Sequence, residues 1–349
     1  MNKIILIAAV IFAIGQKLSA QTLFVDPVKG NDNASGSQAA PLASLPKAVA
    51  LAGTFNGTEP INIKLAPGLY QLTSRLDITA GNNLAEPAKL TIEAQIMPDD
   101  TTWNGYRMPV ITSVSGTNDQ RKFPHAVGVL VARSNVVFRG LKFTGDPNPE
   151  VFYYYPVVRD SLGAHGLELS QCLFEGDRNS AAIQGALYLE GPGIHIDHCV
   201  FYGCKNALLA FENVSDVSLT HSIILNAYEC AIWYGWKNVP NAPFTFDHNV
   251  VSGCRAVLLA VSDQGAPFHF SHCLLTDNQY YMVKEANNDS GSEPSAVQPQ
   301  EEDVRKSGHI QLMEVTTYGY PHDNLNLVLG SYGYDIGASL FINPKKHVN

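Results

Sequence analysis

The chain alternates apolar and polar residues over short stretches, and this alternation returns at nearly constant intervals between residues 136 and 284. Residues that alternate in this way share one face of a β-strand, because successive side chains of a strand point to opposite sides. Each stretch breaks for two positions, and the intervals between successive breaks are 31, 27, 23, 27 and 24 residues. Such a repeat is typical of a solenoid. The second residue of the break is in turn Gly140, Gln171, His198, His221, His248 and His272.

The segment 193–235 illustrates one repeat. A first strand contains Ile194 and Ile196, a second begins at Cys199, a third spans 207–211, and a turn at 212–216 leads to the next repeat. Three short strands without a helical period favour a parallel β-helix over a leucine-rich repeat, which would carry a helix in each unit. Equivalent inward side chains of successive coils should then stack into a dry core: Phe138, Leu169, Ile196, Leu219, Phe246 and Phe270.

Outside this region the pattern is looser. Before residue 136 it predicts strands at 61–65, 76–78, 90–94 and 110–113, and an amphipathic segment at 44–51, with Pro46 near its start, predicts a short N-terminal capping helix. After residue 284 the alternation stops. Residues 285–307 are rich in Asn, Ser, Glu, Gln and Pro and predict a mobile loop, and the C-terminal segment 308–349 is expected to hold two edge strands within 309–328. We therefore expect one all-β domain over residues 21–349, with regular coils at about 136–284.

Residues 1–20 have the pattern of a secretory signal peptide. Lys3 precedes an apolar run at 4–14, and Leu18-Ser19-Ala20 provides a cleavage site before Gln21. The apolar run is too short to span a bilayer. We expect an exported protein without a membrane span, located in the periplasm, on the surface or outside a Gram-negative cell.

The charge of the chain limits its partners. The formal net charge is −9 at pH 7, and only 16% of the residues are charged. An acidic surface disfavours nucleic acid and long polyanions. Neutral or weakly charged glycans are therefore favoured over pectate, alginate or heparin-like chains.

Five of the six cysteines fall at equivalent positions of the repeats, with Cys172, Cys199 and Cys273 at one position and Cys204 and Cys254 at another. Parallel side chains on adjacent coils are poorly aimed at each other for a disulfide. We therefore expect buried free thiols that pack as small apolar groups.

Two further segments carry a family resemblance. Residues 24–36 (FVDPVKGNDNASG), followed by PLASLPKA at 41–48, resemble the opening of many proteins of the pectin lyase-like, right-handed β-helix superfamily, and GYDIGA at 333–338 is similar to a closing motif in the same proteins. The resemblance covers nearly all of residues 21–349 and implies a single-stranded right-handed parallel β-helix. It implies no particular activity, because the superfamily includes lyases, hydrolases, epimerases and adhesins. The characteristic motifs of polygalacturonases and pectate lyases are missing, so no catalytic residue is carried over.

The histidines lie at the break between the first and second strands, which we call the corner, and they allow two interpretations. Stacked imidazoles could bind a metal or handle protons. However, Gly140 occupies the same corner in the first coil, and histidine is among the residues that tolerate a positive φ. We therefore interpret the histidines as turn residues and predict no metal site.

The outward side of the third strand is the candidate binding surface. The alternation directs Tyr188, Leu209, Trp233 and Leu258 outward, with Phe211 and Trp236 nearby. Aromatic rings with a polar group suit the faces of sugars, and an apolar surface of this size indicates a contact. The alternative is that the C-terminal segment 309–342 folds back over this surface.

Charged residues flank the same strand. Glu190 and Glu212 end the third strand on adjacent coils, at roughly the 5 Å spacing that retaining glycosidases use, or they are two acids that flank turns. Arg159 is a candidate for stabilising charge in a reaction, and Lys237 and Arg255 for substrate binding. We therefore expect a polysaccharide-active or polysaccharide-binding protein, a lyase or a hydrolase if it is an enzyme. The alternative is a noncatalytic structural, adhesin-like or surface protein whose apolar strip docks its own tail or a partner.

Closely spaced oxygen ligands at Asp26, Asn31, Asp32 and Asn33 could hold calcium. The same residue types are common in turns, and the turn interpretation is preferred. We predict a monomer without a cofactor.

Overall fold

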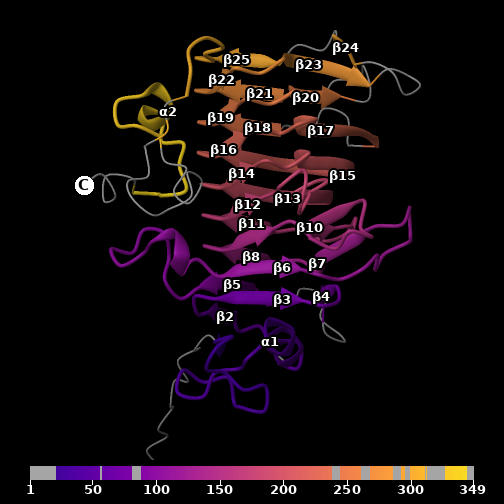
Figure 1. The fold of residues 1–349 in the computed structure, drawn as a ribbon, viewed down its shortest axis with the longest axis vertical. Helices are drawn as coiled ribbons and strands as arrows, with labels where there is room; N and C mark the ends of the chain where they lie inside the picture. Colours follow the sequence, from indigo (N-terminus) through magenta and orange to yellow (C-terminus); the bar gives the residue numbers. More distant parts are fainter. Residues whose placement is uncertain are drawn as a thin grey trace, which may run out of the picture.

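The computed structural model describes residues 21–55, 57–80, 88–237, 244–260, 268–285, 292–294, 299–310, 312 and 327–343, of which 235–237, 284–285 and 292–294 are described by their backbone alone. The predicted signal peptide at 1–20 lies outside the described residues. The described part of the chain is a parallel β-helix whose coils are stacked along one axis (Figure 1). The predicted all-β solenoid is therefore confirmed.

Each complete coil contributes one strand to each of three parallel ladders, which we call the first-strand, second-strand and third-strand ladders, and β1 and β25 extend the first-strand ladder at its two ends. The first-strand ladder consists of β1 (Gln21–Val25), β2 (Ile61–Leu65), β5 (Leu90–Ala94), β8 (Val136–Arg139), β11 (Leu167–Ser170), the later halves of β13 (Leu187–Asp197) and β15 (Asn206–Thr220), β18 (Phe244–Asp247), β21 (Phe268–Ser271) and β25 (Gln300–Glu302).

The second-strand ladder forms a separate sheet of β3 (Leu69–Leu72), β6 (Val110–Ser113), β9 (Lys142–Thr144), β12 (Leu173–Glu175), β14 (Val200–Tyr202), β16 (Ile223–Leu225), β19 (Val250–Ser252) and β22 (Leu274–Thr276). The third-strand ladder consists of β4 (Leu76–Thr79), β7 (Ala126–Ala132), β10 (Tyr154–Arg159), the early halves of β13 and β15, β17 (Cys230–Lys237), β20 (Ala256–Ala260) and β23 (Tyr280–Glu285).

The third strand runs into the first strand of the next coil without a break in β13 and β15. The turn that the sequence predicts at 212–216 is therefore a bend inside β15, where Asn213 and Asp216 adopt φ values of 52° and 51°. Backbone hydrogen bonds to β13 continue on both sides of this bend. As a result, the first- and third-strand ladders belong to one sheet.

The predicted core stack is confirmed residue by residue. The six predicted side chains occupy the same register on successive coils and are at most 1% exposed: Phe138, Leu169, Ile196, Leu219, Phe246 and Phe270. The second-strand ladder adds a stack of its own, in which the rings of Phe143, Phe174 and Phe201 lie 4.8 and 5.0 Å apart and nearly parallel. All six cysteines are buried and free, as expected.

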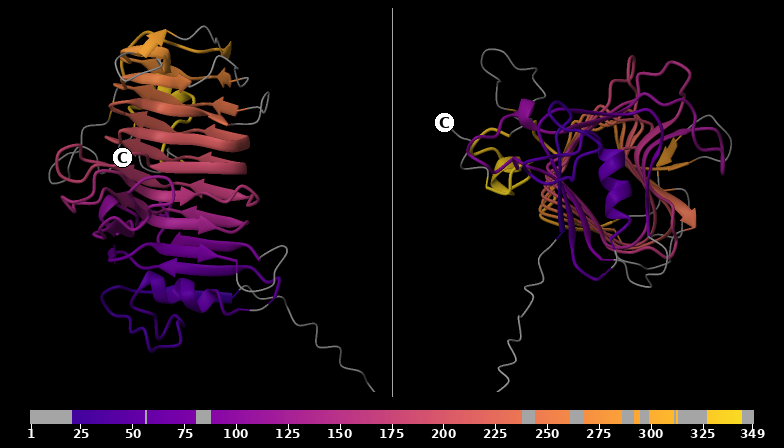
Figure 2. Two further views of the ribbon diagram at one scale, coloured as in Figure 1. Left: turned by 90° about the vertical axis from the view of Figure 1, so that its right-hand side faces the viewer. Right: turned by 90° about the horizontal axis from the view of Figure 1, so that it is seen from below.

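Helix α1 (Leu45–Ala52) lies across the N-terminal end of the coils (Figure 2). The side chain of Ser44 caps this helix by accepting a hydrogen bond from Lys47 N, and Leu45 and Ala48 are buried against the first coil. The predicted capping helix is therefore confirmed. Asp32 accepts hydrogen bonds from Ala43 N and from Ser44 N and Oγ, so this candidate calcium ligand organises the entry to the helix.

The C-terminal part differs from the prediction in two ways. Residues 292–294 and 300–302, expected in a loop, form two strands. β24 (Ser292–Pro294) pairs antiparallel with β23, whereas β25 extends the first-strand ladder, and Arg305 bridges to Leu274 in the second-strand ladder. The edge strands expected within 309–328 are represented among the described residues by one antiparallel bridge, Leu312 to Leu327. The described C-terminal residues 327–343, which include α2 (Tyr332–Asp335), pack beside the second-strand ladder (Figure 1).

No helix in the described part of the chain has the length and apolar character needed to cross a membrane.

Candidate functional site

The outward side of the third-strand ladder carries a row of large side chains. Val158, Tyr188, Leu209, Trp233 and Leu259 share one register on successive coils. The outward direction predicted for Tyr188, Leu209 and Trp233 is confirmed. The prediction for Leu258 is wrong by one position: Leu258 pairs with the inward Ile232 and is buried in the main core. Leu258 and its neighbour Leu259 are both leucine, so the apolar pattern does not show which of them points outward.

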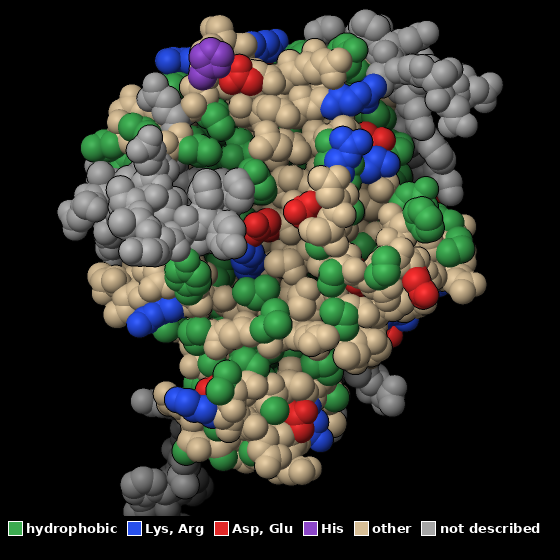
Figure 3. Space-filling model, in the orientation of Figure 1, with side chains coloured by type: hydrophobic (Ala, Val, Ile, Leu, Met, Phe, Trp, Pro, Cys, Tyr) green, Lys and Arg blue, Asp and Glu red, His purple; other side chains and the backbone are tan. Residues whose placement is uncertain are grey.

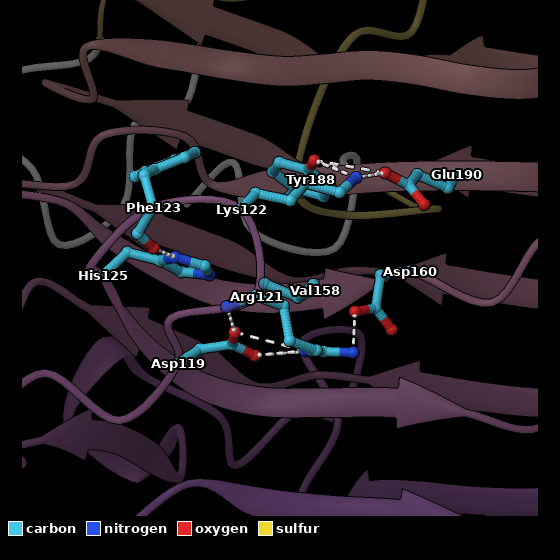
Figure 4. A pocket seen from close by; sticks show the side chains of 9 residues that line it. All are labelled: Asp119, Arg121, Lys122, Phe123, His125, Val158, Asp160, Tyr188 and Glu190. Atoms are coloured by element: carbon cyan, nitrogen blue, oxygen red, sulfur yellow. Dashed lines mark hydrogen bonds and ion pairs between the residues drawn. The ribbon is translucent and has the colours of Figure 1, made fainter.

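A loop from another coil covers part of this surface. The residues from Gly116 to His125, which we call the covering loop, connect β6 to β7 and pass over β10 and β13, as the close view of the site shows (Figure 4). Tyr188 is therefore only 7% exposed, and Leu209 is 1% exposed. The C-terminal segment 309–342, which the sequence offered as an alternative cover, instead packs its described apolar residues against the second-strand ladder.

The covering loop and the third-strand ladder enclose a cavity of about 210 Å³. Its lining comes from the loop and from the outward positions of β10 and β13: Asp119, Arg121, Lys122, Phe123, His125, Val158, Asp160, Tyr188 and Glu190. Figure 4 shows two groups of charged side chains in it, one around Glu190 and one around Asp119 and Asp160.

In the first group, Glu190 forms an ion pair with Lys122 and accepts a hydrogen bond from the hydroxyl of Tyr188 at 3.1 Å. Lys122 Nζ also lies 2.9 Å from the Tyr188 hydroxyl oxygen. Burial, with the neighbouring Glu190 carboxylate adding to it, raises the pKa of Tyr188. Because the side chain of Glu190 is only 4% exposed, this carboxylate faces the cavity and not the open surface.

In the second group, Arg121 binds both Asp119 and Asp160, and Arg75 also binds Asp119, at 2.8 Å. Burial acts to raise the pKa of Asp119, but hydrogen bonds from Arg121 outweigh it and lower that pKa to about 2. Asp119 is therefore a permanent anion that holds the loop arginine in place. Asp160 is the more accessible carboxylate, with a side chain 14% exposed against 1% for Asp119.

Arg159, a predicted catalytic residue, lies directly beside this cavity but points into the protein. It is fully buried, and its Nε donates a hydrogen bond to the backbone carbonyl oxygen of Glu190 at 2.7 Å. Burial lowers the pKa of the guanidinium to about 10. From this position Arg159 supports the backbone of Glu190, and it is not among the residues that line the cavity.

Glu212 and Arg255 are not among the residues that line the cavity. Glu212 is opposite Glu190 in the ladder, across a register irregularity, and is partly exposed. Lys237 follows at the same register on β17, but its side chain and that of Trp236 lie outside the described residues. Arg255 precedes β20 at the opposite end of the third strand, with its guanidinium 5.7 Å from the centre of the Tyr280 ring. The described structure therefore brings together Glu190, Tyr188 and Arg159, and leaves Arg255 apart from them.

The histidine corner has the geometry of a turn. His198, His221, His248 and His272 have φ values between 47° and 57°, and Gly140 has 67°. Neighbouring rings stack with centroids 4.6–5.0 Å apart. Asp197 accepts from the Nδ1 atoms of His198 and His221, and Asp247 lies within 3.1 Å of those of His248 and His272.

Each of these two groups brings three ligand atoms within 4.8 Å of one another. However, stacked and nearly parallel rings direct their nitrogen lone pairs along parallel lines and not toward one point, as tetrahedral coordination needs. The structure therefore supports the interpretation of the histidines as turn residues.

Sequence reasoning missed the residues that the covering loop supplies, namely Asp119, Arg121, Lys122, Phe123 and His125. Two signals were available. The connection between the second and third strands has 12 residues here, at 114–125, against three in the coil at 202–206, and it contains two adjacent cations followed by an aromatic residue. A long insertion of this kind in a solenoid marks a binding face.

Comparisons with known proteins agree with this architecture. A family model described as right handed beta helix region matches residues 123–295. The solved structure of deglycosylated pectin methylesterase from Aspergillus niger superposes with a TM-score of 0.51 at 13% identity, covering 91% of this chain and 98% of that chain. The same enzyme in penultimately deglycosylated form gives 0.50 at 14% identity, covering 83% and 86%.

A rhamnogalacturonan lyase is matched with a TM-score of 0.40 at 15% identity, covering 82% of this chain and 67% of that chain. No curated protein sequence matches the chain. At these identities the likeness concerns the fold. The chain is a right-handed parallel β-helix protein with the pectin lyase-like fold, as its sequence resemblance implied.

Proposed function

We propose that this protein acts on a polysaccharide at the cavity beneath the covering loop, and that it hydrolyses a glycosidic bond there with Asp160 and Glu190. The observation that carries the proposal is the convergence of these two carboxylates on one cavity. Arg159 pairs with Leu189 in the ladder, so the residues that follow them, Asp160 and Glu190, leave adjacent coils on the same side. Adjacent strands are about 4.8 Å apart, close to the roughly 5 Å separation that retaining glycosidases use.

The chemistry needs one carboxyl group that gives a proton to the glycosidic oxygen and one carboxylate on the other side of the sugar ring. Water then completes the reaction, so that one hydroxyl group forms on each product. Arg121 and Lys122 hold the carboxylates in place before substrate enters, and Arg159 fixes the backbone of Glu190. Preorganised charges of this kind stabilise the charge that develops in the transition state.

This pair replaces the pair that the sequence suggested. Glu212 is next to Glu190 in the ladder but does not line the cavity, whereas Asp160 does.

The test is product release from a polysaccharide panel by the wild type and four variants. We expect Asp160→Asn and Glu190→Gln each to slow release by about 100-fold or more, as loss of a general acid or base does. Glu212→Gln should have a much smaller effect. Glu168→Gln is a matched control, because Glu168 is also an ion-paired glutamate but lies on the first-strand ladder, paired with Lys89.

The products separate the remaining possibilities. Saturated sugars with new reducing ends support hydrolysis, and unsaturated sugars would show elimination. Retention of a glycan without products would identify a binding protein, and neither retention nor products would leave the structural role as the better interpretation.

A further inference from the structure

Aromatic side chains form an unbroken series across the outward side of the third-strand ladder. The series begins in the residues before β10, passes through the covering loop and crosses β13 and β15 to reach β17. Successive ring centroids are separated as follows: Tyr153–Phe123 5.5 Å, Phe123–Tyr155 6.5 Å, Tyr155–Tyr188 5.4 Å, Tyr188–Phe211 4.9 Å and Phe211–Trp233 5.8 Å.

The middle of this series is buried and its two ends reach the surface. Tyr155 and Tyr188 are covered by the loop, whereas Phe123 is 36% and Tyr153 is 41% exposed. At the other end, Phe211 and Trp233 are partly exposed. Glu190 hydrogen bonds to Tyr188, so the carboxylate lies beside the buried middle, between two accessible aromatic patches.

Phe152, the residue before Tyr153, enlarges the exposed aromatic patch at this end of the series. Phe152 is 88% exposed, the highest value of any large apolar side chain in the described part of the chain. An aromatic side chain left this exposed beside a second exposed aromatic residue is typical of a contact surface.

The charges of the cavity indicate what kind of glycan fits. Both loop cations are already bound to protein carboxylates, Lys122 to Glu190 and Arg121 to Asp119 and Asp160. A sugar carboxylate would enter a cavity lined by three carboxylates and two such cations. Figure 3 shows one face of the molecule on which acidic and basic side chains are interspersed, without a broad basic patch among the described residues. An uncharged sugar avoids the repulsion that a polyanion would meet.

We propose that the third-strand face binds an uncharged polysaccharide as an extended chain, with sugar units stacked on Phe123 and Tyr153 on one side of the cavity and on Phe211 and Trp233 on the other. This inference rests on the proposed function, because it assigns the substrate class of the same cavity. The apolar faces of pyranose rings pack on aromatic rings, while sugar hydroxyl groups remain free for polar partners. Binding on both sides of the carboxylates means that the reactive bond lies inside the chain and not at its end.

The experiment measures binding of the full protein to soluble xylan, β-glucan, galactan and mannan as uncharged probes, and to polygalacturonate and alginate as anionic probes. A second step uses an oligosaccharide series of the polysaccharide that is retained. We expect retention by at least one uncharged probe, with affinity that rises as the oligosaccharide becomes long enough to reach both patches. Retention by anionic probes alone, or by none of the six, overturns the proposal.

Variants locate the two patches. Phe123→Ala and Tyr153→Ala should each weaken binding of the long oligosaccharide by about five- to tenfold, the effect expected of one aromatic contact, and should leave binding of the shortest unchanged or less affected. Trp233→Ala and Phe211→Ala test the other patch. If the Trp233→Ala variant does not fold, Phe211→Ala tests this patch alone. Tyr106→Ala is the control, because Tyr106 is 70% exposed but belongs to η1 (Gly105–Arg107), whose neighbour Trp103 packs on the C-terminal segment.

The two proposals fail in different ways. If the aromatic variants weaken binding but the wild type releases no product, the catalytic proposal fails and the binding surface stands. If product forms and the four aromatic variants bind and react like the wild type, the binding surface is overturned and the catalytic proposal stands.

Discussion

At the corner between the first and second strands, the backbone takes a positive φ that glycine accepts freely and other residues accept at a cost. His248, with a φ of 57°, offsets this cost by stacking on His221 and His272 and by the contact of its Nδ1 with Asp247 Oδ2 at 2.8 Å. One residue therefore meets a backbone requirement and builds a side-chain ladder.

A pair of substitutions separates these two contributions. His248→Ala and His248→Gly both remove the ring, but only glycine relieves the backbone, so we expect the alanine variant to be less stable than the glycine variant by about 1 kcal/mol. The measurement is the free energy of unfolding in denaturant. At Thr245, an exposed position in the interior of β18, the same two substitutions should give the opposite order. An alanine variant of His248 as stable as the glycine variant would contradict the backbone requirement.

The aspartates of the corner make the ladder sensitive to acid. Burial acts to raise the pKa of Asp197, but hydrogen bonds from His198, His221 and Thr220 outweigh it, so the pKa is lowered. A carboxyl group whose pKa is lower in the folded state contributes stability above its unfolded pKa and loses it as the pH falls through the folded value.

We therefore expect Asp197→Asn to destabilise the protein at neutral pH and to differ less and less from the wild type as the pH falls below about 4, the usual carboxyl range. Unfolding midpoints measured at a series of pH values provide the test. Asp216→Asn is a control, because Asp216 is exposed and its carboxylate lies 3.8 Å from His195. A constant difference between Asp197→Asn and wild type at every pH would contradict the prediction.

At the scale of elements, the C-terminal segment acts as a cover for the second-strand ladder. Phe341 is 1% exposed and packs edge-on against Trp103 with ring centroids 5.2 Å apart. Around it lie outward apolar residues of the ladder and described residues of the segment: Leu173, Val200, Ile223, Val250, Leu274, Leu327, Ala338 and Leu340. Without this cover, a contiguous apolar surface would face water.

Phe341→Ala should therefore release the segment before the coils unfold. Loss of a buried phenylalanine costs about 3–5 kcal/mol, which is more than a short segment can lose and stay docked. Limited proteolysis should cut the C-terminal segment of this variant first, and dyes that bind apolar surface should bind more strongly. Ile342→Ala, at a neighbouring residue that is 46% exposed, should behave like the wild type. Equal proteolysis of both variants would show that Phe341 does not hold the segment.

The elements that sequence reasoning could predict are those whose apolar residues repeat. The inward stack from Phe138 to Phe270 and the strands at 61–65 and 90–94 follow directly from alternation. Where both sides of a strand are apolar, as at Leu258 and Leu259, alternation cannot choose the face. β25 has the sequence Gln-Glu-Glu and no apolar alternation. It is a strand because its backbone pairs with β21, which its side chains do not indicate.

The site follows the same rule. Tyr188 and Glu190 could be placed on the outward side because they lie on a regular strand. Lys122 lies 68 residues before Glu190 in the chain, on an irregular loop, and its contact with Glu190 depends on the path of that loop across two coils. Arg159 pairs with the inward Leu189, so its burial follows from alternation once the register of β10 against β13 is known, and that register was not apparent from the sequence.

At the scale of the whole molecule, the coils form a one-dimensional stack in which each coil contacts mainly its neighbours. The described strands of Figure 2 lie in successive layers, closed by α1 at the N-terminal end. A solenoid of this kind has no single centre, so a defect in the core should be felt near its own coil first.

Phe174 tests this property. Its ring is sandwiched between those of Phe143 and Phe201, at 4.8 and 5.0 Å, and it is fully buried. Phe174→Ala should cost about 3–5 kcal/mol, and the cavity it leaves would border only the coils of β9, β12 and β14. Hydrogen exchange should therefore accelerate in these three strands while β2 and β21, several coils away on either side, keep the protection of the wild type. Equal loss of protection in β2 and β21 would show that the coils unfold as one cooperative unit, in which case the stability of the cavity between β10 and β13 would depend on every coil and not on its neighbours alone.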